Sequence, residues 1–187
     1  MEDGKRKICR VRIPYRRDDD PVLPDDLVTA IRARRAGGNL LNLDRMLLNS
    51  PAFARGWNAM FATIRGCLSL APRMRELVIV AVGVLNDAEY ECAQHESEFL
   101  AAGGTQEQLN ELIDVSAACE NPILFDEAER AALSLALEMT RSVNVSEGTI
   151  GRLRTVMPDQ QVVELVGTVA AYNMVSRFLV ALGIELE

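Results

Sequence analysis

Residues 72–104 read PRMRELVIVAVGVLNDAEYECAQHESEFLAAGG, and this stretch decides the fold class. Residues 74–85 within it are apolar almost all round, which by periodicity alone fits either a buried strand or a buried helix. The length of the run, its charged start at Arg73, Arg75 and Glu76, and the lack of a second such run favour a helix. We therefore expect one buried helix at the centre of the fold.

A second helix is expected after a short break. Asn86 and Asp87 end the apolar run, and a new helical segment extends from about residue 89 to residue 102. Gly103 and Gly104 come directly after this segment, and glycine commonly follows the end of a helix because it tolerates the left-handed backbone conformation. Two helices joined by so few residues form an antiparallel hairpin. The sequence therefore predicts a central antiparallel helical hairpin.

Local start and stop signals predict helices through the rest of the chain. The expected helices are residues 25–35 with Asp25 or Asp26 as the cap, 40–48, 51–66, a helix opened by a capping box of Thr105 and Gln108, 126–141, one from Ser146 to before Pro158, and 159–182. In the third helix around residues 51–66, apolar side chains at helical spacing predict a core stripe of Phe53, Trp57, Met60, Phe61 and Ile64. No strand pattern appears, so the expected fold class is all-α.

The composition is that of a globular protein. Hydrophobic residues make up 49% of the 187 residues and charged residues 25%, a length and balance that fit one domain. The net charge of -7 argues against nucleic acid as the main partner. Residues 1–24 are basic, then acidic, then proline-containing, and we expect them to form a solvated, partly flexible arm. The helical domain is then expected to span residues 25–187.

The cysteines and the hydrophobic stretches bear on the cellular location. The four cysteines are widely spaced and form no CxxC pair: Cys9, Cys67, Cys92 and Cys119. No apolar core follows the basic N-terminal residues, so no export signal is evident, and we expect reduced thiols in a cytoplasmic protein. Charged residues interrupt the long hydrophobic stretches, so no membrane span and no membrane partner are expected.

The candidate chemistry centres on His95, the only histidine in the chain. Glu91 precedes it by four residues, so the two side chains share one face of a helix. Glu91 can accept a proton from one imidazole nitrogen and leave the other nitrogen to act on a substrate as acid or base. The hairpin can bring Glu76 beside this pair, and an apolar setting would raise the pKa of the Glu76 carboxyl, which suits acid–base catalysis.

Other interpretations of these residues stay open. Glu91 and His95 could equally form a surface pair of little energetic weight, since such pairs are common on helices. A zinc site is less favoured, because one histidine with scattered carboxylates is a poor ligand set, and we expect no metal. Cys92 could be a thiolate nucleophile activated by His95, but its position on the turn favours a packed thiol.

Four further polar side chains lie within apolar helical segments: Tyr90, Tyr172, Asn173 and Arg177. Such groups are normally hydrogen-bonded when they are buried. Arg177 could pair with a substrate carboxylate or with Glu164.

These residues together resemble a known family. The pattern comprises Arg73-Met-Arg-Glu76-Leu-Val-Ile-Val, Asn86, Tyr90-Glu91-Cys92-Ala-Gln-His95, Gly103-Gly104, Asp126-Glu-Ala-Glu-Arg-Ala-Ala-Leu133, Val163-Glu164-Leu, Tyr172-Asn173 and Arg177. It is similar to the carboxymuconolactone decarboxylase family, whose members share the alkylhydroperoxidase D-like all-helical fold. The resemblance covers about residues 25–187, and it indicates the family more strongly than the substrate.

The resemblance also distinguishes two chemistries. Peroxidase-type members carry a glutamate, then eleven residues, then CxxC, and a histidine four residues after the second cysteine. Glu76 and His95 match this pattern, but Ala88 and Glu91 occupy the cysteine positions, so a dithiol cycle is not expected. The decarboxylase-like branch carries Tyr-Glu-Trp before the histidine, and here Cys92 replaces the tryptophan.

The resemblance therefore implies an enzyme without metal or organic cofactor that acts on a small carboxylated lactone or a related acid. In this hypothesis His95 transfers the proton, Glu91 orients it, Glu76 assists, and Arg73 or Arg177 holds the substrate carboxylate. The alternatives are a peroxidase-like antioxidant role that uses Cys92 and a non-catalytic scaffold or binding protein. The family resemblance also implies self-association as a trimer or hexamer.

Overall fold

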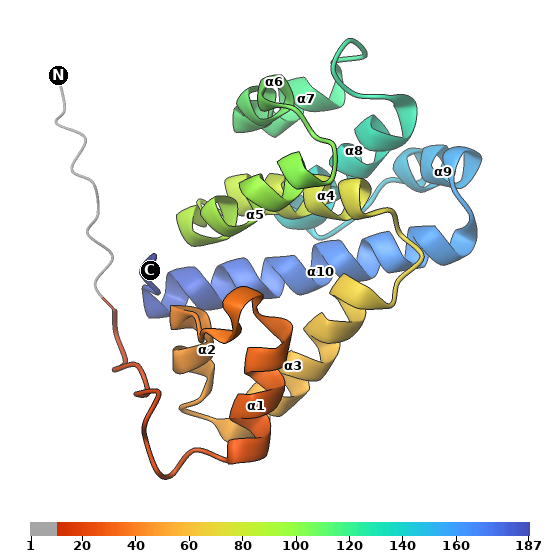
Figure 1. The fold of residues 1–187 in the computed structure, drawn as a ribbon. Helices are drawn as coiled ribbons and strands as arrows, with labels where there is room; N and C mark the ends of the chain where they lie inside the picture. Colours follow the sequence, from red (N-terminus) through yellow and green to blue (C-terminus); the bar gives the residue numbers. More distant parts are fainter. Residues whose placement is uncertain (1–10) are drawn as a thin grey trace, which may run out of the picture. The chain divides into compact units, whose positions relative to one another are not determined.

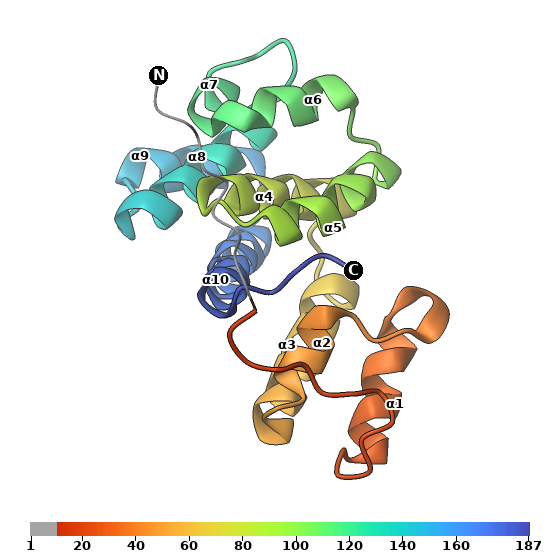
Figure 2. The same ribbon diagram turned by 90° about the vertical axis from the view of Figure 1, so that its left-hand side faces the viewer.

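The computed structural model describes residues 11–187, and within them it is helical without strands, as the sequence predicts (Figures 1 and 2). The described residues form two compact units, one of residues 11–66 with Leu179–Glu187 and one of Cys67–Phe178. The helices are α1 (Asp25–Arg34), α2 (Asn42–Leu47), α3 (Pro51–Gly66), α4 (Pro72–Leu85), α5 (Glu89–Ala101), α6 (Gln106–Glu111), α7 (Val115–Cys119), α8 (Glu127–Ser142), α9 (Glu147–Val156) and α10 (Asp159–Leu182), with short 3-10 turns at Ala36–Gly38 and Leu112–Asp114.

The unit Cys67–Phe178 is built around α4, which packs against both α5 and α8 (Figure 1). Residues 76–83 of α4 are all buried, including the carboxyl-bearing Glu76. An apolar run that is buried on every side cannot be recognised as strand or helix by its period, but its length fits a helix. The expectation of a central buried helix is confirmed.

The turn between α4 and α5 forms the predicted hairpin. Asn86 caps α4, and Asp87 adopts a positive φ of 51°, which reverses the chain in two residues. A Cβ atom added to Gly83 would lie 2.9 Å from Sγ of Cys92. The absence of a side chain at Gly83 therefore allows α5 to approach α4 closely at the level of Cys92.

Capping residues set the starts of three helices as predicted. Thr105 and Gln108 form a capping box at α6, and Asp126 forms one with Glu129 at α8. The Ser146 hydroxyl accepts a hydrogen bond from the first turn of α9. These side chains satisfy backbone N–H groups that have no partner within the helix, which explains why the boundaries were predictable.

In the other unit, the α3 stripe is only partly buried. Trp57, Phe61 and Ile64 lie in the core, but Phe53 and Met60 are 47% and 38% exposed, so the sequence prediction is wrong for these two. They lie at the edge of the apolar stripe, and helical spacing does not show where the neighbouring elements stop covering it.

The start of α1 also differs from the prediction. Pro24 occupies the N-cap position and forms no side-chain cap, and Asp25 and Asp26 lie in the first turn of the helix. There the two carboxylates interact favourably with the helix dipole.

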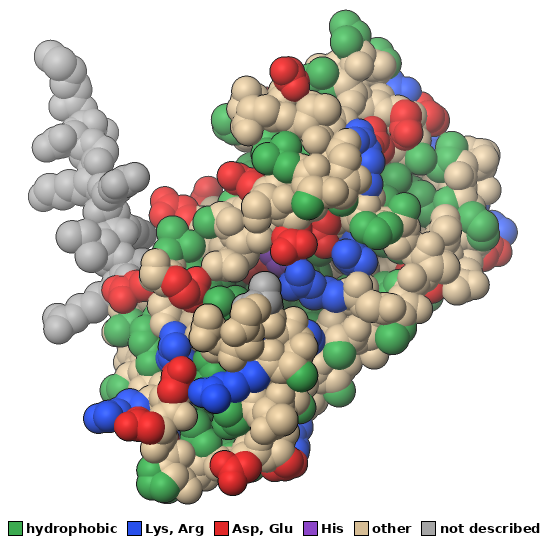
Figure 3. Space-filling model, in the orientation of Figure 1, with side chains coloured by type: hydrophobic (Ala, Val, Ile, Leu, Met, Phe, Trp, Pro, Cys, Tyr) green, Lys and Arg blue, Asp and Glu red, His purple; other side chains and the backbone are tan. Residues whose placement is uncertain are grey.

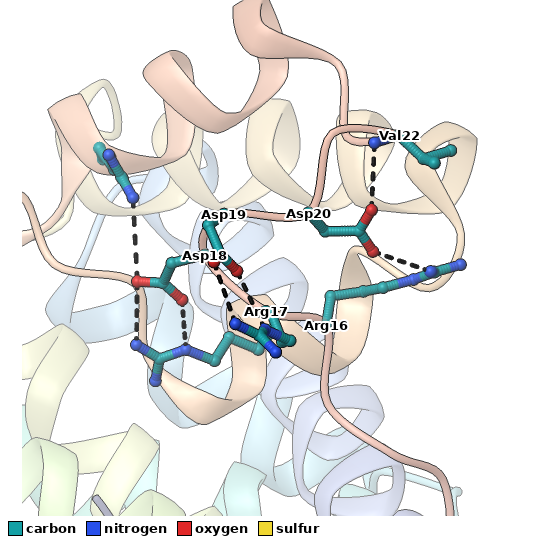
Figure 4. A network of polar contacts seen from close by, with 8 residues as sticks. Arg16, Arg17, Asp18, Asp19, Asp20 and Val22 are labelled. Carbon is teal, nitrogen blue, oxygen red and sulfur yellow. Dashed lines mark hydrogen bonds and ion pairs between the residues drawn. The ribbon is translucent and has the colours of Figure 1, made fainter.

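Residues 11–24 were predicted to belong to an arm. Within their own unit, Arg12 donates a backbone hydrogen bond to Leu182, and Tyr15 accepts one from Glu185. Figure 4 shows a turn held by ion pairs between Arg16 and Asp20, between Arg17 and Asp19, and from Asp18 to neighbouring arginines. The basic residues Lys5, Arg6, Lys7 and Arg10, and also Cys9, lie outside the described residues.

Helix α10 corrects the expectation that no segment is long enough to cross a membrane. Residues 165–182 contain one charged residue, Arg177, so helix Asp159–Leu182 is long and apolar enough to cross a membrane, judged by its length and composition alone. Half of its most apolar stretch is buried inside the structure, and core helices of soluble proteins can be equally long and apolar.

Candidate functional site

Three side chains predicted to act together meet at the α4–α5 hairpin. His95 Nδ1 lies 2.6 Å from Glu76 Oε2, and His95 Nε2 lies 3.1 Å from Glu91 Oε1. All three residues are at most 5% exposed. The structure therefore places an imidazole between two buried carboxylates, and we call Glu76, His95 and Glu91 the site cluster.

The local sequence explains this arrangement. Glu91 and His95 are four residues apart on α5, so their side chains lie on one face of that helix. Glu76 lies on α4, and the tight turn at residues 86–87 returns the chain so that α5 runs beside it. Tyr172 of α10 meets the imidazole edge-to-face, with ring centroids 5.2 Å apart.

Both imidazole nitrogens have a carboxylate neighbour, which differs from the sequence interpretation that one nitrogen would be left for a substrate. Burial disfavours the charged ring, but the contacts with Glu76 and Glu91 outweigh it and raise the pKa of His95 to about 9 from an ordinary 6.5. His95 is therefore an imidazolium at neutral pH, with an N–H directed to each carboxylate.

The pKa of Glu76 changes in the opposite direction to the sequence-based expectation. Burial alone would raise it, but the hydrogen bonds and positive charges of His95 and Arg75 lower it below its ordinary value. Arg75 Nε donates to Glu76 Oε1 at 3.0 Å. Arg75 is not among the site residues that the sequence predicts, although its position as a basic residue beside Glu76 was the available signal.

Cys92 is a packed and poorly acidic thiol. Burial and the nearby carboxylates of Glu96 and Glu91 raise its pKa to about 11. Its sulfur lies against the backbone of Gly83. A reactive cysteine needs a lowered pKa, so this environment does not favour a thiolate nucleophile.

Arg73, predicted to bind a substrate carboxylate, contacts protein groups instead. Its Nε donates to Glu129 at 2.8 Å, and its two terminal nitrogens donate to the Gln108 side chain and to the Gly103 carbonyl. The guanidinium also lies over the Phe99 ring, 5.8 Å from its centroid. Arg73 therefore connects α4 with α8, with α6 and with the α5–α6 loop, which does not support the predicted role in substrate binding.

Asn173 and Arg177 of α10 take part in a hydrogen-bonded group with Asn86 and Thr140. Asn173 donates to Thr140 at 2.9 Å and accepts from Asn86 at 3.1 Å and from Arg177. Glu164 does not pair with Arg177 but accepts hydrogen bonds from the loop that precedes α4. Asn173 is thus hydrogen-bonded to protein groups, and the alternative in which Arg177 pairs with Glu164 is wrong.

Tyr90 and Tyr172 are buried at 5% and 2% exposure. Tyr172 contacts His95, as described above, and Tyr90 directly precedes Glu91 on α5. Of the predicted substrate-binding residues, these two tyrosines therefore lie nearest in space or in sequence to the site cluster.

On the face drawn in Figure 3, acidic and basic side chains are interspersed rather than gathered by sign.

In the part of the chain that the structure describes, no group of three or more His, Cys, Asp or Glu side chains has an arrangement that could hold a metal ion.

Comparisons with known proteins place these observations in context. Residues 51–138 match the profile of the Carboxymuconolactone decarboxylase family. No curated protein matches the chain significantly.

Solved structures share the fold at low sequence identity. A peroxidase-related protein from Silicibacter sp. TM1040 is 20% identical, with 95% of this chain and 94% of that chain covered and a TM-score of 0.78. The alkylhydroperoxidase AhpD core protein from Ralstonia eutropha JMP134 is 20% identical over 95% and 92% of the two chains, with a TM-score of 0.79. The debrominase Bmp8 is 19% identical over 93% and 90%, with a TM-score of 0.71. The chain therefore has the alkylhydroperoxidase D-like all-helical fold.

Proposed function

Because residues 51–138 match the profile of the carboxymuconolactone decarboxylase family, we propose that the protein decarboxylates a small carboxylated lactone or a related acid by proton transfer, without a metal or organic cofactor. The observation that carries the proposal is the buried imidazole of His95 between the carboxylates of Glu76 and Glu91. An imidazolium oriented in this way is a suitable general acid at neutral pH.

In the proposed reaction, the bond between the ring carbon and the substrate carboxylate breaks, and carbon dioxide leaves. The electron pair of that bond is delocalised into the carbonyl system of the ring. His95 then donates its Nε2 proton to carbon, the electrons of the N–H bond stay on the imidazole, and water later restores the proton. Nε2 is assigned this task because its contact with Glu91, at 3.1 Å, is longer than the 2.6 Å contact of Nδ1 with Glu76.

Glu76 and Glu91 have different parts in this proposal. Glu76 holds Nδ1 and stabilises the imidazolium, as a carboxylate behind a catalytic histidine commonly does. Glu91 keeps the Nε2 proton in place until the substrate takes over that contact. We propose that Tyr90 and Tyr172 line the binding site of the substrate, which is a small-molecule carboxylate or lactone.

We also propose that the protein acts in the cytoplasm and self-associates as a trimer or hexamer. Several large apolar side chains are exposed in the described chain, and Ile113, Ile123 and Val143 are 77%, 90% and 84% exposed. Large exposed apolar patches mark protein–protein interaction surfaces, so these side chains are the candidates for the surface that the proposed oligomer covers.

The peroxidase-like alternative has less support. A thiol with a pKa of about 11 is almost wholly protonated at neutral pH, and Ala88 and Glu91 occupy the positions of the family's two cysteines. The similar peroxidase-related and debrominase structures share the fold at about one-fifth identity, so they do not transfer an activity.

The proposal is tested by supplying a panel of carboxylated lactones and small carboxylic acids in D₂O. We expect the wild type to release carbon dioxide from at least one compound and to place one deuterium on the product carbon. Substituting His95→Ala should slow this reaction roughly 10²- to 10⁴-fold, the usual loss when a general acid is removed. Cys92→Ser is the matched control on the same helix and should retain activity.

Three results would argue against the proposal. Loss of activity in Cys92→Ser would favour thiol chemistry. Unchanged turnover in His95→Ala would remove the imidazole from the mechanism. Absence of both turnover and ligand-induced thermal stabilisation across the panel would favour a non-catalytic scaffold, because a ligand that binds the native state raises its stability.

A further inference from the structure

Arg75 contacts the site cluster but has no part in the proposed decarboxylation. Arg75 Nε donates to Glu76 Oε1 at 3.0 Å, and Glu76 Oε2 lies 2.6 Å from His95 Nδ1. The side chains of Arg75 and Glu76 are 15% and 2% exposed. Each oxygen of a buried carboxylate therefore has its own cationic partner, one on α4 and one on α5.

Two partners hold a carboxylate more firmly than one. The guanidinium of Arg75 is charged at every accessible pH and presents its N–H groups in a fixed plane. With Oε1 held by Arg75, Oε2 has one orientation toward the imidazole. This fixes the ring, so that Nδ1 is the anchored nitrogen and Nε2 faces Glu91.

Arg75 also affects how tightly the proton is held. Without Arg75, the full negative charge of Glu76 would attract the imidazolium and make its proton harder to release. Arg75 competes for the same carboxylate, and with it the charges of Arg75, Glu76, His95 and Glu91 sum to zero. The ring of Tyr172 of α10 also faces the imidazole of His95, edge-to-face.

We propose that Arg75 is a positioning residue that aligns His95 through Glu76 and weakens the hold of Glu76 on the imidazolium proton, so that the proton can pass to a substrate. The effect on turnover rests on the proposed decarboxylation. The effect on the imidazole does not, because it follows from the contacts among Arg75, Glu76 and His95.

A purely structural role for Arg75 is the competing explanation, and the chain offers a matched control. Arg73 lies two residues earlier on α4 and also forms an ion pair with a buried glutamate, Glu129, at 2.8 Å. Its described contacts are with other groups than Glu76 and His95. Arg73→Gln should therefore cost stability without changing the site cluster.

The experiment follows the imidazole signal of the single histidine by NMR between pH 6 and pH 11 in the full chain. In Arg75→Gln we expect the pKa of His95 to rise by about one unit, because a positive charge near the cluster is lost. Glu76→Gln should change it in the opposite direction, and Arg73→Gln should leave it at the wild-type value. Arg75→Lys should restore part of the wild-type behaviour because it returns the charge without the planar geometry.

The outcomes separate this inference from the proposed function. An unchanged or lowered pKa of His95 in Arg75→Gln would overturn it, and so would an equal rise in Arg73→Gln. If the glutamine variant does not fold, Arg75→Met decides, because it also removes the charge but keeps the length of the side chain, and an imidazole titration indistinguishable from the wild type would then overturn the inference. On an identified substrate, Arg75→Gln should lower kcat about 10-fold with little change in KM, because the general acid is still present. If no substrate is found, the proposed function fails while the titration still decides the role of Arg75.

Discussion

His95 and Glu76 are 19 residues apart in the chain, and their side chains meet at 2.6 Å across the α4–α5 hairpin. Both are buried, and each changes the ionisation of the other. Such a pair is costly to bury unless both charges are compensated, and the contacts with Arg75 and Glu91 supply that compensation. The pair therefore makes the stability of the protein depend on pH. The same pair also takes part in the proposed chemistry.

The first prediction concerns stability as a function of pH. Because the pKa of His95 is raised from 6.5 to about 9, its contribution is fully present below pH 6.5 and is lost as the pH rises through 9. Because the pKa of Glu76 is lowered, its contribution is present above its ordinary 4.5 and is lost in acid. Urea unfolding should therefore show that the free energy of unfolding falls by roughly 3 kcal/mol between pH 6 and pH 10.

The control for this prediction is His95→Gln, which keeps a polar side chain but cannot titrate. Its free energy of unfolding should be lower than that of the wild type at pH 6, and it should fall much less toward pH 10. An equal fall in both proteins would show that other groups cause the pH dependence.

The second prediction concerns the thiol of Cys92. With a pKa of about 11, it should react with iodoacetamide at pH 7 far more slowly than the exposed Cys67, because only the thiolate is nucleophilic. Peptide mapping by mass spectrometry after timed alkylation measures both rates in one sample. Faster labelling of Cys92 than of Cys67 would revive the peroxidase-like alternative.

The third prediction concerns assembly. Light scattering should give a mass near a trimer or hexamer of the 20.6 kDa chain at micromolar concentration. Exposed Ile113 and Ile123 are candidates for the covered surface, and replacing both with lysine tests this. A wild type that scatters as a monomer would remove self-association from the account.

Local signals explain how much of the fold the sequence predicts. The caps at Thr105, Asp126 and Ser146 act within one helical turn, so the residues themselves reveal the boundaries. The contact of Glu91 with His95 is likewise a matter of helical spacing. The hairpin that adds Glu76 follows from the short break after residue 85.

Contacts between distant segments explain what the sequence did not predict. Arg73 stands next to the candidate site in the sequence, but its partners lie on α8, on α6 and in the α5–α6 loop. The direction of the Glu76 pKa depends on two cations whose side chains had to be located first. Phe53 and Met60 carry the right spacing for a core, but no neighbouring element covers them fully.

An NMR titration of the wild-type protein tests most directly whether His95, between Glu76 and Glu91, is protonated on both ring nitrogens at neutral pH. The chain has a single histidine, so its imidazole signals need no assignment among several. We expect a pKa of about 9, with both ring nitrogens protonated at pH 7. A pKa near 6.5, with one ring nitrogen unprotonated at pH 7.5, would contradict the account.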